Sequence, residues 1–318
     1  MLSRRTMMAA APATALAGQA FAQGSAGAPA PAITGQPGYY RYKVGDIEVT
    51  AIHDGFANRP LEGFIRNAEI ADVKKAMADA FLPQDVLPIT FTTLVLKTGG
   101  KTVLIDTGNG DVGAPTTGRW MGNFRAAGFD PASVDTVLIS HFHGDHISGL
   151  RLKDGTAVFP KAEVKVPETE WAFWMDDAKM AAAPDGMKPA FANVRRVFGP
   201  MQKDVARYAA NTEVAPGVTA VPAYGHTPGH STFVISSGGK SLMMVVDITN
   251  HPALFVRNPT WAAVFDMDAD MARQTRIRTL DMAAAEKTQV AFYHAPFPAT
   301  GFIAKDGPGF RFVPVQWT

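Results

Sequence analysis

The sequence contains no cysteine in its 318 residues. It can therefore form no disulfide and offer no thiol nucleophile, and any metal site must be built from histidine and carboxylate ligands. A strong excess of charge is also lacking, since the formal net charge is +1. A nearly neutral chain has no basic field that would attract nucleic acid or an anionic membrane surface. We therefore expect no nucleic-acid partner.

The chain also lacks a long apolar run at its N-terminus. Residues 1–22 contain Arg4 and Arg5, then an uncharged, alanine-rich stretch that is too short to span a membrane and ends in Ala-Phe-Ala. This layout is that of an export signal, and the paired arginines resemble a twin-arginine signal. Removing these two from the 30 basic residues leaves 28 against 29 acidic ones. We expect a soluble protein, periplasmic or secreted, without an integral membrane segment in its mature form.

Residues 23–38 are rich in glycine, alanine and proline and predict a flexible lead-in. Beyond them, β-rich runs indicate strands at 40–49, 91–97, 102–106, 136–140, 162–166, 218–223, 232–236, 241–246, 290–293 and 310–315. Apolar residues at three- and four-residue spacing indicate helices at 72–81, 120–127, 168–183, 191–198 and 269–287. Because the elements come in runs rather than strict alternation, we predict one layered α+β domain over residues 39–318.

The segment HFHGDH, residues 141–146, directly follows the apolar run 136–140. It places three imidazoles and a carboxylate, His141, His143, Asp145 and His146, at the point where a buried strand gives way to a loop. A strand end can aim several side chains into one small volume, as a divalent metal requires. Histidine and aspartate without thiolate suit Zn²⁺ or a neighbouring first-row ion.

Three further candidates lie at other strand ends. His226 follows the strand 218–223 in a turn rich in glycine and proline, which would hold its side chain at a fixed angle. Asp247 ends the apolar run 241–246, where a carboxylate would otherwise be poorly placed, and His294 follows the strand 290–293.

The order HFHGDH, then GHTPGH at 225–230, then a strand-terminal Asp and a strand-terminal His, resembles the metallo-β-lactamase superfamily. The segment LIDTG at 104–108 is similar to an early motif of that superfamily. The late segments HAPFP at 294–298 and RFVPV at 311–315 resemble its exported branch, which includes methyl parathion hydrolase. N-acyl-homoserine lactonases are more distant relatives. The resemblance implies a four-layer αββα sandwich that holds two divalent metal ions, with zinc the expected metal, in a cleft at the sheet edges.

The resemblance also implies which side chains hold the two ions. The ligands of the first ion would be His141, His143 and His226. Those of the second would be Asp145, His146 and His294, and Asp247 would bridge both ions.

Four other side chains have separate expectations. Asp106 is expected to orient a ligand imidazole through a hydrogen bond rather than merely to form a turn. His230 is expected to pack or hydrogen-bond near His226 rather than bind metal. His53 and His251 are expected at structural or surface positions.

The resemblance implies a hydrolase in which two ions share a hydroxide, lowering the pKa of water from 15.7 toward about 7. The hydroxide would attack a carbonyl or phosphoryl centre, and Asp145 would act as a catalytic residue that relays a proton to the leaving group. Aromatic side chains, above all Trp174 and Phe191 and less so Trp120, are candidates for the substrate pocket, although such spacing also suits a helical core. A neutral ester, lactone or aryl phosphotriester is the expected substrate.

Two alternatives stay open at this stage. A thioester hydrolase of the glyoxalase type would need a basic patch for glutathione, and the late segments carry no cluster of lysine or arginine. A non-catalytic metal-binding or sensor protein would bind metal without turnover. Acyl-homoserine lactonases usually carry a tyrosine three residues after the bridging aspartate, where this chain has Asn250. This departure argues against a dedicated acyl-homoserine lactonase and leaves other lactones open as substrates. A homodimer also stays open.

Overall fold

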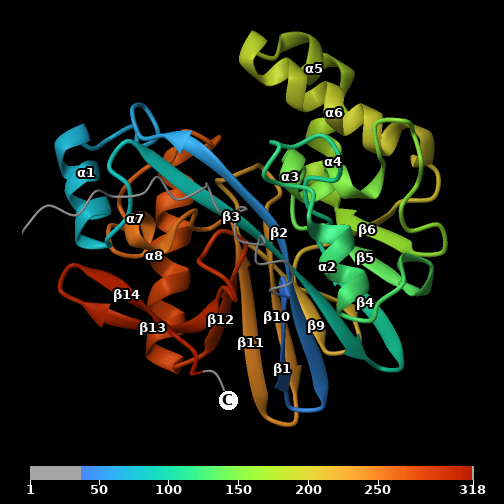
Figure 1. Ribbon diagram of the computed structural model, residues 1–318. Helices are drawn as coiled ribbons and strands as arrows, with labels where there is room; N and C mark the ends of the chain where they lie inside the picture. Colours follow the sequence, from blue (N-terminus) through green and yellow to red (C-terminus); the bar gives the residue numbers. More distant parts are fainter. Residues whose placement is uncertain (1–36, 317–318) are drawn as a thin grey trace, which may run out of the picture. The chain divides into compact units, whose positions relative to one another are not determined.

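Two seven-stranded β-sheets form the centre of the computed structural model, which describes residues 37–316 (Figure 1). The predicted export signal at residues 1–22 lies outside the described residues, as does all but the last two residues of the predicted lead-in at 23–38.

Neighbouring strands of the first sheet are also consecutive in the chain. Its strands are β1 (Tyr39–Val44), β2 (Ile47–Pro60), β3 (Val86–Thr98), β4 (Lys101–Ile105), β5 (Thr136–Leu138), β6 (Glu163–Pro167) and β7 (Ala206–Tyr208). Strands β1 to β4 pair antiparallel, whereas β4, β5, β6 and β7 pair parallel. The carboxyl ends of β4 and β5 therefore lie at the same edge of the sheet.

The second sheet has the spatial order β14-β13-β12-β11-β10-β9-β8. Its strands are β8 (Thr212–Ala215), β9 (Val218–Pro222), β10 (Ser231–Ser237), β11 (Lys240–Val246), β12 (Gln289–Phe292), β13 (Thr300–Asp306) and β14 (Gly309–Pro314). Strands β9 and β11 both pair antiparallel with β10, and β12 pairs parallel with β11. The carboxyl ends of β9, β11 and β12 consequently meet at one edge.

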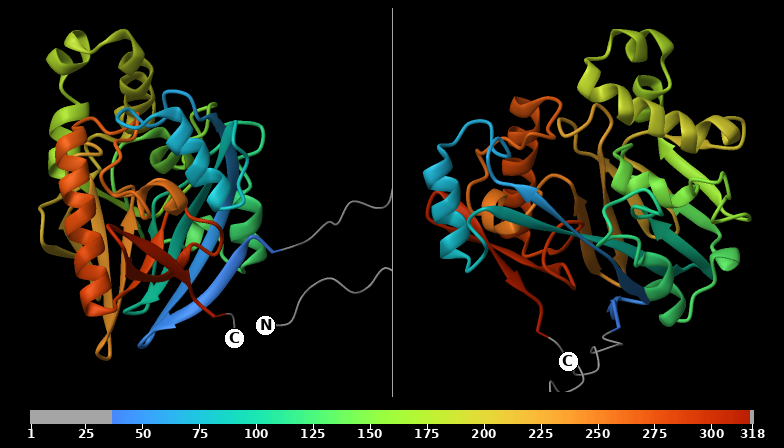
Figure 2. Two further views of the ribbon diagram at one scale, coloured as in Figure 1. Left: turned by 90° about the vertical axis from the view of Figure 1, so that its left-hand side faces the viewer. Right: turned by 45° about the horizontal axis from the view of Figure 1, so that its top comes forward.

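Eight α-helices surround the two sheets within residues 37–316. They are α1 (Ile70–Asp79), α2 (Trp120–Ala126), α3 (Gly144–Ile147), α4 (Glu168–Trp174), α5 (Asp177–Ala182), α6 (Lys188–Phe198), α7 (Pro252–Phe255) and α8 (Ala269–Glu286). In the left view of Figure 2, α8 lies outside the second sheet and α2 lies outside the first, on the opposite side of the molecule. The predicted αββα sandwich is confirmed. No helix within residues 37–316 has the length and apolar character needed to cross a membrane.

The burial of β11 on both faces explains the unbroken apolar run in its sequence. Successive side chains of a strand point to opposite faces, and here both faces are buried. Met244 packs in the core between the two sheets, whereas Met243 and Val245 pack with Leu280 and Ala283 of α8. Both faces must therefore be apolar, which gives the sequence Leu-Met-Met-Val-Val.

The structure divides two of the predicted elements and adds strands that were not predicted. The predicted strand 40–49 is a hairpin that turns at Gly45, whose φ of +57° favours glycine. The predicted helix 168–183 is two helices, because the Asp176 side chain accepts a hydrogen bond from the Lys179 backbone N–H and starts α5. Strands β7, β8 and β13 were not predicted.

Candidate metal centre

The seven predicted ligands come together at one edge of the sandwich. The segment that carries His141 and His143 follows β5 and enters α3, which holds Asp145 and His146. His226, Asp247 and His294 follow β9, β11 and β12. Strand direction thus explains the convergence, because the carboxyl ends of these strands all point to this edge.

One group of ligand atoms comprises three imidazole nitrogens. His143 Nδ1 lies 3.2 Å from His141 Nε2 and 2.9 Å from His226 Nε2. Asp247 Oδ2 lies 3.3 Å from His226 Nε2 and 4.0 Å from His141 Nε2. The carboxylate therefore borders this group.

A second group comprises Asp145, His146 and His294. Asp145 Oδ2 lies 3.4 Å from His146 Nε2 and 3.6 Å from His294 Nε2. Asp247 reaches this group as well, with Oδ1 3.4 Å from His146 Nε2 and Oδ2 3.0 Å from His294 Nε2. Asp247 thus contacts both groups, which is the position of a bridging ligand.

These spacings suit divalent ions. Ligand atoms at about 2.0–2.1 Å from a tetrahedral Zn²⁺ lie about 3.3 Å from one another. In addition, His146 Nε2 and Asp247 Oδ1 are buried and have no hydrogen-bond partner among the described residues. Unpartnered buried polar atoms are costly, and a cation between them would satisfy both. The donor set therefore fits divalent metal binding.

The protonation states differ among the members of the cluster. The neighbouring carboxylates outweigh burial and raise the pKa of His226 to about 9 and that of His146 well above its ordinary value, so both imidazoles would release a proton on metal binding. Burial raises the pKa of Asp247, but His294 and His146 outweigh burial and hold this pKa well below its ordinary value. Burial, reinforced by His226, lowers the pKa of His143 to about 3. The carboxylate is therefore ionised and the His143 imidazole neutral near pH 7, as metal ligation requires.

Asp106 lies where an orienting role requires it. Its Oδ2 lies 2.8 Å from His146 Nδ1, so the opposite nitrogen, Nε2, faces the cluster. Asp106 also accepts hydrogen bonds from the backbone N–H and the hydroxyl of Ser140. Its φ of +58° is a left-handed conformation that aspartate and asparagine tolerate better than most residues.

Two supports of the ligands were not predicted from the sequence. Asp266 Oδ1 lies 3.0 Å from His226 Nδ1, and Asp266 Oδ2 accepts a hydrogen bond from Arg276. The backbone carbonyl of Thr90, in β3, lies 2.9 Å from His294 Nδ1. Asp266 ends no strand, and a backbone carbonyl leaves no residue signature, so the sequence offered no signal for either.

A third unpredicted support is Glu170, which joins two ligand segments. Its buried carboxylate accepts hydrogen bonds from the backbone N–H groups of Phe142, at 3.0 Å, and Gly229, at 2.6 Å. Trp174 donates its indole N–H to the same carboxylate. Glu170 therefore ties the segment 141–146 to the segment 225–230.

A cavity of about 710 Å³ opens over the ligands. His143, Asp145, His226, Asp247 and His294 all line it. Its other lining residues are partly apolar and partly amide-bearing, and they include Ile89, Phe91, Val112, Phe265, Asn58, Asn109, Asn193 and Asn250. Among the described lining residues Arg59 is the one arginine or lysine. The cavity therefore suits a small molecule with polar and apolar parts.

The predicted aromatic pocket is corrected by the structure. Trp120, Trp174 and Phe191 do not line this cavity and are at most 4% exposed. They belong to the core between the first sheet and its helices, where Trp174 packs against Phe191 with ring centroids 4.7 Å apart and ring planes tilted by 53°. The helical-core alternative holds for these residues, and Phe91 and Phe265 supply the aromatic lining instead.

The expectation for His230 is confirmed. Its Nε2 accepts the backbone N–H of Asp247 at 3.1 Å, and its Nδ1 lies 3.0 Å from the Ala223 carbonyl. His53 packs its ring against Phe297. Both are structural positions.

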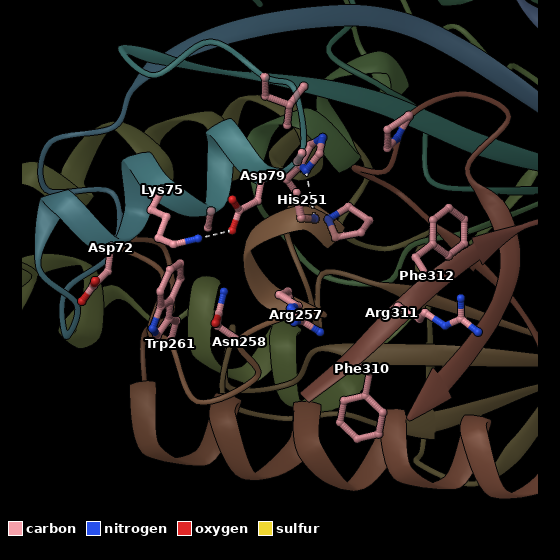
Figure 3. A pocket seen from close by; sticks show the side chains of 16 residues that line it. Asp72, Lys75, Asp79, His251, Arg257, Asn258, Trp261, Phe310, Arg311 and Phe312 are labelled. Atoms are coloured by element: carbon pink, nitrogen blue, oxygen red, sulfur yellow. Dashed lines mark hydrogen bonds and ion pairs between the residues drawn. The ribbon is translucent and has the colours of Figure 1, made fainter. Parts of the chain in front are cut away.

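A second cavity, of about 850 Å³, lies between α1, α7 and β14 (Figure 3). The predicted ligands are not among its described lining residues, which include Trp261, Phe310 and Arg311. The larger cavity is therefore separate from the metal centre.

His251, drawn in Figure 3, lines the larger cavity. Its side chain accepts a hydrogen bond from the Ala253 backbone N–H at the start of α7, so the expectation of a structural role for His251 is confirmed.

His251 predicts a loss of stability in mild acid. Burial lowers its pKa from 6.5 to about 4. Because this folded-state pKa lies below the unfolded value, the stabilisation is complete above pH 6.5 and is lost as pH falls toward 4. Between pH 7.5 and 5 this residue alone should cost about 2 kcal/mol. His251→Asn, which keeps a capping side chain, should flatten the dependence when unfolding in urea is measured at both pH values. An equal pH dependence in both proteins would contradict the assignment.

The chain is similar to several known proteins. The sequence model of the Metallo-beta-lactamase superfamily matches residues 88–290. An N-acyl homoserine lactonase, AttM of Agrobacterium fabrum, is 27% identical over 182 residues, which are 51% of this chain and 65% of that protein. A beta-lactamase-like protein 2 homolog of Drosophila melanogaster is 36% identical over 69 residues, 22% of each chain. The chain thus spans less than two thirds of the length of these relatives.

Two solved structures match more completely. AidC, a dizinc quorum-quenching lactonase in complex with a product, is 28% identical with a TM-score of 0.84. The hydrolase AbOPH in the beta lactamase superfamily is 26% identical with a TM-score of 0.83. Each match covers 88% of this chain and 98% of the other.

Proposed function

We propose, since the chain belongs to the metallo-beta-lactamase superfamily, that this hydrolase opens lactones with the help of two zinc ions. The observation that carries the proposal is the pair of ligand groups that share Asp247 at the floor of the 710 Å³ cavity. The lactonases AidC and AttM, which resemble this chain, support the choice of substrate. The narrower resemblance to the methyl parathion hydrolase branch stays a prediction.

The proposed ligands divide into two sets. His141, His143 and His226 would hold one ion, Asp145, His146 and His294 the other, and Asp247 would bridge them. Divalent ions held there would supply Lewis-acid chemistry, by lowering the pKa of water toward about 7 and by polarising the substrate oxygen.

Asp145 is the proposed proton carrier. Burial raises its pKa, but His146 and His294 outweigh burial and hold this pKa well below its ordinary value. Its carboxylate is therefore ionised near neutral pH, and it lines the cavity. In that state it can take up the proton that water loses on attack and pass it to the departing alcohol oxygen of the opened ring.

The cavity favours neutral, compact substrates. Its lining combines Phe91, Phe265 and Ile89 with amide side chains, and Arg59 is the one arginine or lysine among the described lining residues. A glutathione thioester would place two carboxylates in a site with few cations to meet them. Lactones, and next to them carboxylic esters and phosphotriesters, therefore fit better than glyoxalase-type substrates.

A panel assay tests this proposal. Metal-replete protein should be compared by kcat/KM on a γ-lactone, an aryl ester, an aryl phosphotriester, a thioester and a β-lactam. We expect the lactone to rank first, a chelator to abolish turnover, and Zn²⁺ to restore it. Elemental analysis should find two zinc ions per chain.

Other outcomes would overturn parts of the proposal. A higher rank for the ester or phosphotriester would replace the substrate class, and one ion per chain would contradict the two-metal site. Stoichiometric metal without turnover on the whole panel would favour a metal-binding or sensor protein.

Asp106→Asn tests the orientation of His146. Asparagine tolerates the positive φ of this position, but its amide is a weaker acceptor for His146 Nδ1 than the carboxylate. We expect metal affinity to fall about 10- to 100-fold, as for other partners of ligating histidines. Competition with a chromogenic chelator measures this affinity. Asp130→Asn, a change at an exposed capping carboxylate, is the control. Equal affinity in Asp106→Asn and wild type would contradict an orienting role.

A further inference from the structure

Phe81, just beyond the end of α1, has an almost fully exposed side chain. It is 97% exposed, more than any other large apolar side chain within residues 37–316. Single apolar residues that are partly exposed are ordinary on protein surfaces. A phenylalanine that buries almost none of its ring against its own chain gains nothing from the hydrophobic effect on folding, so its place on the surface needs another explanation.

The backbone of Phe81 is also unfavourable for phenylalanine. Its φ is +57°, in the left-handed region. Helix α1 ends here in a Schellman motif, in which the Leu82 N–H donates to the Met77 carbonyl at 2.9 Å. The Phe81 N–H donates to the Ala78 carbonyl at 3.0 Å. Glycine usually occupies the left-handed position of this motif, because a side chain there is strained. A strained, bulky residue with almost no contact to its own chain indicates a contact with another molecule.

The 850 Å³ cavity between α1, α7 and β14 lies directly beside Phe81 (Figure 3). Ala80 and Leu82, the two chain neighbours of Phe81, line this cavity, whereas Phe81 itself does not. The half-buried rings of Trp261 and Phe312 contribute aromatic lining. A protruding aromatic ring and a cavity with aromatic walls thus lie side by side on the surface of the molecule.

The same surface carries unpaired charges of both signs. Asp72 of α1 and Arg311 of β14 line the cavity, and Figure 3 shows them at its opposite ends. Within residues 37–316 neither side chain forms an ion pair. Val313 shares a strand face with Arg311 and pairs with Phe302, and both of these apolar side chains are exposed. The surface therefore combines exposed apolar groups with opposite charges, as a self-complementary interface requires.

We propose that this surface joins two copies of the chain about a two-fold axis, with Phe81 of each copy inserted into the 850 Å³ cavity of the other. A two-fold axis makes every contact twice, so one protruding ring beside one cavity gives two matched insertions. The same axis brings Asp72 of each copy to Arg311 of the other, because the two charges lie at opposite ends of the cavity. A small molecule in the cavity would leave Phe81 exposed, whereas a second copy covers both features.

Sedimentation velocity of the metal-replete protein over a concentration series tests the insertion, and it depends on no substrate. Wild type should be a dimer at micromolar concentration, and Phe81→Gly should raise the dissociation constant about 30-fold or more, as for a central aromatic residue of an interface. Glycine suits the left-handed backbone, so Phe81→Gly should not lower the midpoint of urea unfolding at a concentration where both proteins are monomeric. Met282→Ala, which removes an exposed apolar side chain outside the cavity lining, is the control and should dimerise as wild type does.

Two charge reversals test the two-fold arrangement. Asp72→Lys and Arg311→Glu each place like charges together in the proposed dimer, so each should raise the dissociation constant about 10-fold or more. In an equimolar mixture of the two variants every such contact again joins opposite charges. A dimer with one copy of each variant should therefore form with about the wild-type affinity.

Several outcomes would overturn the proposal. A wild type that stays monomeric throughout the series would leave a small molecule or another protein as the occupant of the cavity. A dimer that Phe81→Gly does not weaken would have its interface elsewhere. A lower unfolding midpoint of Phe81→Gly would mean that Phe81 serves the fold of its own chain. A mixture that associates as weakly as the single charge variants would contradict the two-fold contact between Asp72 and Arg311.

Discussion

Asp247→Ala is expected to abolish hydrolysis, with kcat/KM lowered at least about 10³-fold. Asp247 contacts both groups of ligand atoms, with Oδ2 3.0 Å from His294 Nε2 and 3.3 Å from His226 Nε2. Removing it takes away the one carboxylate that joins them, together with the negative charge buried among the imidazoles. Elemental analysis should show fewer than two zinc ions per chain, beside activity assays on the same preparation.

A stability measurement makes this prediction independent of substrate choice. Ligand that binds only the folded state stabilises it by about 2.7 kcal/mol at a concentration of 100 Kd. Added Zn²⁺ should therefore raise the unfolding midpoint of wild type by much more than that of Asp247→Ala. Asp185→Ala, which removes an exposed carboxylate paired with Lys188, should respond to zinc as wild type does. A full zinc response in Asp247→Ala would contradict a bridging role.

The ligands could be proposed from sequence because each follows an apolar strand or lies in a dense local motif. The short strand β5 is separated from HFHGDH by two residues, and its direction then places this segment beside the ends of β9, β11 and β12. Local sequence thus predicts which residues are ligand candidates. The sheet order, which comes from the whole fold, predicts that they meet.

The cavity wall could not be predicted in the same way. Trp174 and Phe191 have helical spacing, and a helix presents such residues either to a cavity or to the core. The choice depends on how the helix packs against the first sheet, which no local pattern encodes. Phe265 lies outside the helices and strands, between α7 and α8, and Phe91 lies within β3. Neither position carries a sequence pattern that indicates a cavity wall.

Local sequence also could not predict the role of Arg276, which is a central support of the metal centre in the structure. It lies in α8 and is 1% exposed, where a guanidinium is costly unless fully paired. It donates to Asp266 at 3.1 Å, to the Ile248 carbonyl at 2.6 Å and to the Pro259 carbonyl at 3.2 Å. Asp266 in turn contacts His226 Nδ1. One buried cation thereby holds both the backbone after Asp247 and the partner of a ligand.

Arg276→Met is therefore expected to destabilise the fold by about 3–5 kcal/mol, the usual cost of leaving one partner of a buried ion pair alone. Urea unfolding of the zinc-free protein measures this directly. In the double variant with Asp266→Asn the loss should be smaller than the sum of the two single losses, because the second change removes the unpaired charge that the first creates. Additive losses, or a single loss below about 1 kcal/mol, would contradict the pairing. Metal affinity should fall in both single variants, since each frees the His226 imidazole to rotate.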